Sequence, residues 1–183
     1  MTPIFSTARR RGRWVSLAAV LIATLAGTCA IASGASAQSS RCAITTYTDP
    51  PREVLHCPNG LSVSAERSSD YRLVDRDRDG SPDAAELTSR GLLIESPPKR
   101  GRFQILTPHA IATVRGTVWA VDVTAVRTSV FVKRGTVEVA RPGSRDAVTL
   151  RAGDGVDVEQ TGGLQAKRWS SERALLLLGR FGR

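Results

Sequence analysis

The sequence predicts an all-β domain that ends in a short helix, and two features of the chain carry this prediction. From residue 103 onward, short apolar runs recur about every ten residues, which is the spacing of strands in a sandwich or barrel. Turn-forming residues separate these runs, as at Arg141-Pro142-Gly143-Ser144 and Thr161-Gly162-Gly163. We therefore expect short strands joined by tight turns.

The strands can be placed in chain order from this pattern. Leu61, Val63 and Ala65 alternate with serines, which is the period of a strand, and residues 71–74 form a second expected strand. Residues 85–94 fit either a helix or a strand, and the composition of residues 91–94 favours strands. Pro97 and Pro98 interrupt the pattern, because neither can donate a hydrogen bond to a sheet. The other expected strands contain residues 103–106, 111–114, 118–123, 130–132, 137–139, 148–150 and 156–158.

The last segment of the chain has the pattern of a short helix. Ser170-Ser171-Glu172 is typical of a helix start, residues 173–178 continue it, and Gly179 ends it. Residues 175–178 are four consecutive leucines. We therefore expect this helix to pack against the sheet.

The first 37 residues have the pattern of a secretory signal peptide. Four arginines between residues 9 and 13 precede an uncharged apolar stretch from Trp14 to Ser40, and Ala35-Ser36-Ala37 supplies the small residues that a signal peptidase requires. We expect cleavage after about Ala37 and release into the periplasm. The alternative is an uncleaved inner-membrane signal anchor, because the apolar stretch is long enough to span a bilayer.

Charge and aromatic content bear on the class of partner. Cleavage removes four arginines and no acids, which lowers the net charge from +9 to +5. Such a charge suits an acidic envelope surface as well as nucleic acid. The aromatic residues are not interleaved with basic ones in the way that single-stranded nucleic acid requires. We therefore expect no nucleic-acid partner and, after cleavage, no stable membrane insertion.

Two of the three cysteines, Cys42 and Cys57, follow the signal segment. In an oxidising compartment this pair predicts one disulfide that closes a short loop. The alternative is a metal site that includes His56. One histidine and two cysteines fall short of the four ligands of a structural zinc site, so the disulfide is favoured.

An ordered set of residues in the centre of the chain carries a family resemblance. Thr107-Pro108 is followed, after a strand of alternating alanines, by Arg115-Gly116-Thr117, and Gly135 and Gly153 mark the turns that come next. Over roughly residues 60–160 this set resembles the FecR domain family. No single motif in the set is specific, but their order and spacing are.

The resemblance implies an all-β periplasmic module of β-sandwich or β-helix-like architecture. In the founding FecR protein, such a module relays a signal from an outer-membrane transporter, through a membrane helix, to a cytoplasmic sigma factor. Only thirteen residues precede Trp14, which leaves no room there for a sigma-factor-binding domain. We therefore expect an exported FecR-like binding or sensing module that recognises an envelope protein or polymer, with a role in signal transduction left open.

This interpretation divides the chain into four parts. Residues 1–37 are the signal peptide and residues 38–59 a disulfide-closed segment. Residues 60–162 are the FecR-like β domain, and residues 163–183 a helical tail.

A run of acids matches the spacing of a calcium-binding loop. The ligand positions are occupied by Asp75, Asp77, Asp79, Ser81, Asp83 and Glu86, with Gly80 at the sharp turn. Pro82 has no N–H at a position where an EF-hand pairs its backbone, and the preceding segment is an expected strand, so an EF-hand is disfavoured. Two interpretations stay open: an isolated Ca²⁺ loop in a structural envelope protein, or a turn whose aspartates bond their own backbone.

No catalytic motif is recognisable in the chain. The two histidines, His56 and His109, are not near a nucleophile motif, and G-x-S-x-G, H-E-x-x-H and phosphate-binding glycine loops are absent. Asp122 and Glu138 form a carboxylate pair only if the fold brings them together. We therefore predict that the protein is not an enzyme.

The apolar residues change parity around Arg115-Gly116-Thr117. They occupy even positions up to Val118 (Ala110, Ala112, Val114, Val118) and odd positions from Trp119 onward (Trp119, Val121, Val123). Side chains of a strand alternate between its two faces, so this change predicts a β-bulge or a corner, which a glycine tolerates. Arg115 either caps that corner or points outward to a ligand.

Overall fold

The structure is a computed structural model that describes residues 42–98 and 101–183. The predicted signal peptide, its cleavage site and the alternative membrane anchor lie outside these residues. Within the described part, no helix is long and apolar enough to cross a bilayer.

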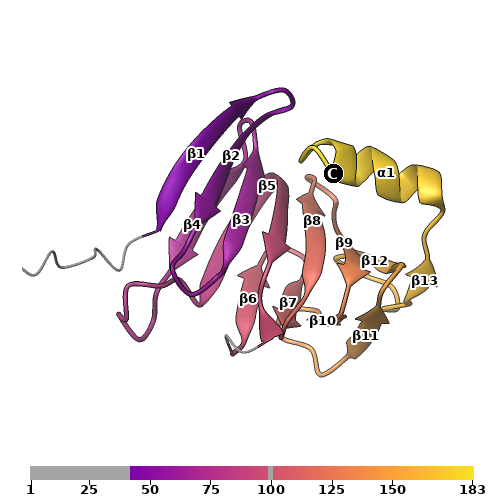
Figure 1. The fold of residues 1–183 in the computed structure, drawn as a ribbon. Helices are drawn as coiled ribbons and strands as arrows, with labels where there is room; N and C mark the ends of the chain where they lie inside the picture. The colour runs from indigo at the N-terminus through magenta and orange to yellow at the C-terminus, as the bar shows by residue number, and fades with distance from the viewer. Residues whose placement is uncertain (1–41, 99–100) are drawn as a thin grey trace, which may run out of the picture. The chain divides into compact units, whose positions relative to one another are not determined.

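The described residues form strands and one short helix, which confirms the predicted fold class (Figure 1). In chain order the elements are β1 (Ala43–Thr48), β2 (Pro51–His56), β3 (Ser62–Glu66), β4 (Asp70–Val74), β5 (Ala84–Glu95), β6 (Phe103–Leu106), β7 (Ile111–Val114), β8 (Val118–Val123), β9 (Arg127–Arg134), β10 (Thr136–Ala140), β11 (Ala147–Arg151), β12 (Asp154–Glu159), β13 (Lys167–Arg168) and α1 (Ser171–Gly179). Each predicted apolar run lies in one of the strands from β3 to β12, except that Leu61 directly precedes β3.

The long strand β5 connects two layers of one curled sheet. Its first half pairs with β4 and, in parallel, with β6, whereas its second half pairs with β3 and β8. One layer therefore contains β1, β2, β3, β8, β9, β12 and β13, and the other contains β4, β6, β7, β10 and β11. Arg90, where β5 passes between the layers, has a positive φ of 68°.

The main core lies between the two layers and contains the fully buried Phe103, Trp119 and Leu92. A second apolar cluster lies on the outer face of the first layer, where Leu177 and Leu178 of α1 pack with Phe131 of β9. Consequently β8 is buried on both faces. Its odd-numbered residues face the main core and its even-numbered residues face α1.

Helix α1 begins where the sequence predicts. The Ser170 side chain accepts a hydrogen bond from the Arg173 N–H at 3.3 Å, and the helix ends at Gly179. It packs against the sheet as expected, but through only half of the leucine run, because Leu175 and Leu176 are 63% and 70% exposed. Four consecutive residues cover the whole circumference of a helix, so they cannot all face one surface.

The segment before residue 60 continues the sheet. Strands β1 and β2 form a hairpin, and β2 pairs with β3. The predicted Cys42–Cys57 disulfide is present and joins the two ends of this hairpin. Because the disulfide uses both cysteines, the alternative metal site with His56 is wrong.

Candidate functional site

The Arg-Gly-Thr segment lies where the chain passes from β7 in one layer to β8 in the other. Gly116 has a φ of +70°, and a Cβ at this position would lie 2.6 Å from the Cα of Pro98. The fully buried Thr117 donates its hydroxyl to the Thr136 carbonyl at 3.1 Å, and its own carbonyl accepts the Ser96 N–H at 2.9 Å. The parity change of the sequence is therefore a corner between layers.

The turns on either side reinforce this corner. A Cβ on Gly135, whose φ is +93°, would lie 2.9 Å from the Gly116 carbonyl oxygen. The pairing of β8 with β9 shifts by one residue between Val118 and Trp119, which leaves Lys133 of β9 as the extra residue of a bulge. The corner and the bulge thus lie side by side, on different strands.

Arg115 does not cap the corner through a hydrogen bond to any described residue. Its side chain is exposed and donates no hydrogen bond to another residue of 42–98 or 101–183. Gly153 lies in the turn that joins β11 of one layer to β12 of the other, where a Cβ would meet the guanidinium of Arg168 at 2.6 Å. These motif positions therefore have evident structural uses, apart from Arg115.

Thr107 and Pro108 form the turn between β6 and β7. The Thr107 hydroxyl accepts the Ala110 N–H at 2.8 Å and lies 2.8 Å from the hydroxyl of Thr128 on β9. His109 is buried beside it, with Nδ1 3.3 Å from the Thr128 hydroxyl. These contacts join the two layers.

The acidic loop between β4 and β5 brings three of its predicted ligands together. Carboxylate oxygens of Asp75, Asp77 and Asp79 lie within 4.8 Å of one another. The same side chains bond the loop backbone: Gly80 N–H donates to Asp75 at 2.9 Å and Ser81 N–H donates to Asp79 at 2.7 Å. The loop therefore has features of both sequence interpretations.

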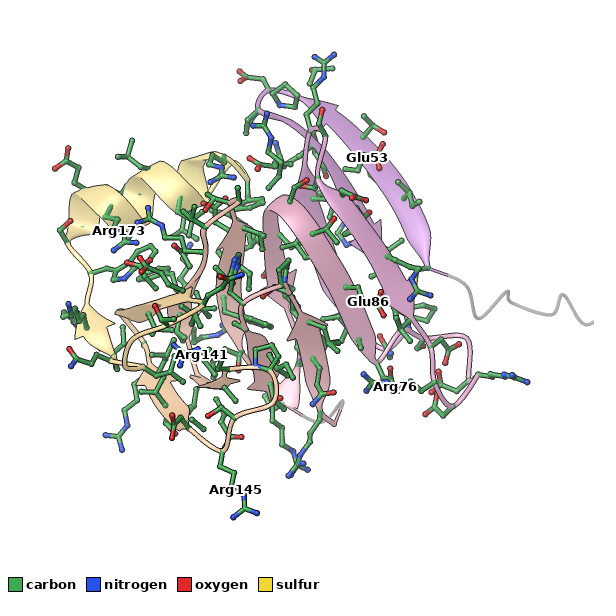
Figure 2. All side chains as sticks on the ribbon, turned by 180° about the vertical axis from the view of Figure 1, so that it is seen from behind. Glu53, Arg76, Glu86, Arg141, Arg145 and Arg173 are labelled. Atoms are coloured by element: carbon green, nitrogen blue, oxygen red, sulfur yellow. A yellow bond between two sulfur atoms is a disulfide. The ribbon has the colours of Figure 1, made fainter. Side chains whose placement is uncertain are left out.

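The last two predicted ligands of the loop, Asp83 and Glu86, have different surroundings. Oδ1 of Asp83, like Oδ1 of Asp75, is buried and has no hydrogen-bond partner among the described residues. Glu86 instead lies on β5, where its carboxylate accepts a hydrogen bond from Arg72 at 2.7 Å, and Figure 2 shows it set back along the strand from the loop that carries Arg76. The loop therefore brings the carboxylates of Asp75, Asp77 and Asp79 together, but Glu86, the predicted last ligand, is not among them.

A groove of about 630 Å³ lies between the β1–β2 hairpin and β4. Both tyrosines of the protein, Tyr47 and Tyr71, line it, although they come from different layers. Thr46 and Thr48 add hydroxyl groups. Sequence reasoning did not identify this site, because neither tyrosine belongs to a motif and only the fold places them together.

Two charged residues of the groove, Arg52 and Glu53, differ in their contacts. The Arg52 guanidinium lies 4.2 Å from the Tyr47 ring centre and donates to the Pro50 carbonyl at 3.0 Å. Glu53 is exposed and has no hydrogen-bond or ion-pair partner within the described residues. Burial, followed by the Glu53 charge, raises the pKa of Tyr71. The groove thus offers two aromatic rings, hydroxyls, the Glu53 carboxylate and the exposed guanidinium of Arg67, which suit a polymer that presents hydrogen-bonding and charged groups.

An aromatic stack attaches α1 to the sheet on the other side of the domain. The Trp169 ring stacks on Phe131 with 5.2 Å between ring centres, and the Arg173 guanidinium lies 3.6 Å from the Trp169 centre. Arg173 and Ser129 each donate to Asp157 at 2.6 Å. Burial alone would raise the pKa of Asp157, but these hydrogen bonds and the nearby arginines outweigh it and lower the pKa.

A second ion-pair group holds the end of the chain. Arg180 donates to Glu66 on β3 and to Asp122 on β8, the latter at 2.7 Å. The hydrogen bond to Glu66 raises the pKa of Arg180 despite its partial burial. Asp122 is thus engaged by an arginine, while Glu138 lies exposed on β10 in the other layer. The fold does not bring these two acids together as a carboxylate pair.

Comparison with known proteins finds solved structures of similar fold but no matching family. No family model and no curated protein matches the chain. Two crystal structures, at 1.65 Å and 2.50 Å resolution, of a protein from Parabacteroides distasonis ATCC 8503 described as a "putative anti-sigma factor" are similar to it, with TM-scores of 0.56 and 0.55 and 18% sequence identity in each case. The alignments cover 74% of this chain and 64% of the chain in each crystal structure.

At this level of identity the likeness shows the fold alone. The resemblance to the FecR family is therefore not confirmed by a family match and stays a prediction. What the comparisons establish is that the chain has a curled all-β fold also found in the two crystal structures described as a "putative anti-sigma factor".

Proposed function

We propose that the protein is an exported, FecR-like binding module without catalytic activity, which recognises a protein or polymer of the cell envelope. The observation that carries the proposal is the groove between the β1–β2 hairpin and β4. It is large enough for a segment of a polymer and combines Tyr47, Tyr71 and the uncompensated Glu53. The fold shared with structures described as anti-sigma factors supports a sensing role.

Export to the periplasm through a cleaved signal peptide is part of this proposal. The Cys42–Cys57 disulfide supports it, since disulfides persist in oxidising compartments. N-terminal sequencing of the protein recovered from a periplasmic fraction would test it. A chain that starts near Gln38 is expected, and an intact N-terminus in the membrane fraction would favour the anchor.

Binding can be tested by exchanging one charge in the groove. The immobilised protein is incubated with envelope extract, and retained proteins and glycans are identified for the wild type and for Glu53→Lys. Glu138→Lys is the matched control, because Glu138 is also an exposed strand residue but lies on β10, outside the groove. We expect a component that the wild type and Glu138→Lys retain and Glu53→Lys loses. Equal retention by all three proteins would contradict binding in the groove.

A second candidate function is calcium binding by the loop of residues 75–83, as in a structural envelope protein. The specific observation in its favour is that Asp75 and Asp83 each bury an oxygen without a partner among the described residues, which is costly unless something compensates it. Carboxylate and carbonyl oxygens are the ligands that Ca²⁺ takes. The ion would be held by Asp75, Asp77 and Asp79, with Ser81 and Asp83 contributing and Glu86 remote.

Calorimetry and thermal denaturation with Ca²⁺ distinguish the two interpretations of this loop. For an extracellular site with a Kd in the submillimolar to millimolar range, Ca²⁺ at ten times Kd would stabilise the fold by about 1.4 kcal/mol. Asp75→Asn should remove both the heat and the stabilisation, whereas Asp146→Asn, in the exposed β10–β11 turn, should not. Absence of heat and of a thermal shift at millimolar Ca²⁺ would leave only the self-bonded turn.

A further inference from the structure

Strand β1 is an edge strand that lacks the usual protection against pairing. Within the described residues it pairs only with β2, and all six of its residues are exposed. Its sequence, Ala-Ile-Thr-Thr-Tyr-Thr, contains no charge and no proline and is rich in residues that favour strands. An edge of this kind is a template for another strand.

The other edge strands of the described sheet differ from β1 in charge. Strand β4 contains Asp70 and Arg72, β11 contains Arg151, and β13 consists of Lys167 and Arg168. Charged side chains on an edge disfavour pairing with another chain. Among the edge strands of the described residues, β1 alone carries no charged side chain.

The backbone groups at the free edge of β1 can be assigned from the neighbouring strand. Arg67 N–H donates to the Pro51 carbonyl, and Cys57 N–H donates to the Leu61 carbonyl, so the odd-numbered residues of β2 direct their backbone groups toward β3. In an antiparallel pair, the residues opposite them then direct theirs away from β2. The partners in the register are Ile44, Thr46 and Thr48. These residues therefore present N–H and C=O groups at the free edge.

An apolar row also ends at this edge. Ile94, Val63, Leu55 and Ile44 are successive partners across β5, β3, β2 and β1, so their side chains share one face of the sheet. The first three are buried, whereas Ile44 is 63% exposed. Within the described residues, no strand beyond β1 covers the exposed end of this row at Ile44.

We propose that two copies of the protein pair through β1 in an antiparallel, two-fold arrangement centred on Ile44. A two-fold axis perpendicular to the sheet keeps each residue on its own face, so only residues of the same parity can be partners. With Ile44 on the axis, Ile44 faces the Ile44 of the other copy, and Cys42 faces Thr46. This register continues the apolar row across both copies.

The chemistry of β1 suits a second copy in particular. The strand is uncharged, so two copies of a basic chain meet there without placing like charges opposite one another. The pairing residues Cys42, Ile44 and Thr46 all have the parity whose backbone groups face the edge, which gives three hydrogen-bonded pairs and about six hydrogen bonds.

The test measures molar mass across a concentration series and compares four variants with the wild type. The full-length gene is expressed, and the product with its disulfide oxidised is analysed by sedimentation equilibrium. We expect a monomer–dimer equilibrium in the wild type. Ile44→Asp should raise the dimer Kd at least about tenfold. Val126→Asp, which changes another highly exposed aliphatic residue in the β8–β9 turn, should leave the Kd unchanged.

A proline variant tests the role of the edge backbone. Thr46→Pro removes an N–H that faces solvent in the monomer, so it should preserve the fold and abolish the dimer. Retention of the melting temperature confirms the fold of each variant. A dimer that persists in Thr46→Pro would refute pairing through β1.

Thr48→Asp tests the register. Thr48 lies beyond the paired residues when Ile44 is on the axis, but it would face Ile44 of the other copy if Thr46 were on the axis. A dimer as weak in Thr48→Asp as in Ile44→Asp would overturn the proposed register. A monomer at all concentrations would overturn the proposal and favour a segment of another protein as the strand that the edge accepts.

Discussion

Substitution of Gly116 tests whether the Arg-Gly-Thr segment is a corner of the fold. Gly116 combines a φ of +70° with a close approach to Pro98, where a Cβ would lie 2.6 Å from the backbone Cα. An L-residue in a left-handed conformation costs about 1–2 kcal/mol, and forcing extra atoms into a packed site adds about 1–3 kcal/mol. We therefore expect Gly116→Ala to lower the free energy of unfolding by about 2–5 kcal/mol.

Gly143 provides a control for the conformational part of this cost. Its φ is +74°, yet a Cβ there would meet nothing within 4 Å. Gly143→Ala should therefore lose only about 1–2 kcal/mol. The difference between the two variants isolates the crowding against Pro98.

Thermal denaturation followed by circular dichroism gives the comparison. For a domain of this size, each kcal/mol lowers Tm by roughly 3–4 °C, so Gly116→Ala should melt roughly 6–20 °C below the wild type and Gly143→Ala roughly 3–8 °C below it. Gly116→Val, which adds a β-branched side chain, should remove most of a typical stability of about 5–15 kcal/mol. Equal melting temperatures for the two alanine variants, or a normal one for Gly116→Val, would refute the close packing of the corner.

Three further predictions concern charge and pH. The pKa of Asp157 is below its ordinary value, so its ion pair with Arg173 stabilises the fold above that value and is lost as pH falls through the folded pKa; Asp157→Asn should flatten the acid limb of a plot of Tm against pH, and an unchanged limb would contradict this. The pKa of Tyr71 is raised above 10.0, so stability should fall as pH rises from about 10 through the raised value, and Tyr71→Phe should remove that loss. Arg180→Met should cost about 1–3 kcal/mol in chemical denaturation, because it leaves Glu66, whose side chain is only 10% exposed, without its partner; a loss below about 0.5 kcal/mol would mean that solvent compensates the carboxylate.

Much of the local structure follows from short-range patterns. The apolar runs predict β3 through β12, and the serine before residue 171 predicts the start of α1. Both signals depend only on residues a few positions apart in the chain. The corner at Gly116 is predicted from parity alone for the same reason. The two-residue strand β13 was not predicted, because it has no apolar alternation to detect.

The candidate sites could be predicted from the sequence only in part. The spacing of Asp75, Asp77 and Asp79 predicts their proximity, because all three lie in one short loop. Glu86 was predicted to close the same loop, but its position on β5 opposite Arg72 gives it another partner. The groove could not be predicted, because Tyr47 and Tyr71 come from strands in different layers.

Short-range patterns in the sequence predicted the all-β class, the strands from β3 to β12, the disulfide, and a bulge or corner near Gly116. Each of these depends on neighbouring residues or, for the disulfide, on a single pair of cysteines after the signal segment. The pairing of distant strands shows that β5 belongs to two layers, that Glu53 has no hydrogen-bond or ion-pair partner among the described residues of the groove, and that the edge strand β1 carries no charge. Strand pairing is a contact between distant segments, and the identity of an edge depends on every other pairing in the sheet.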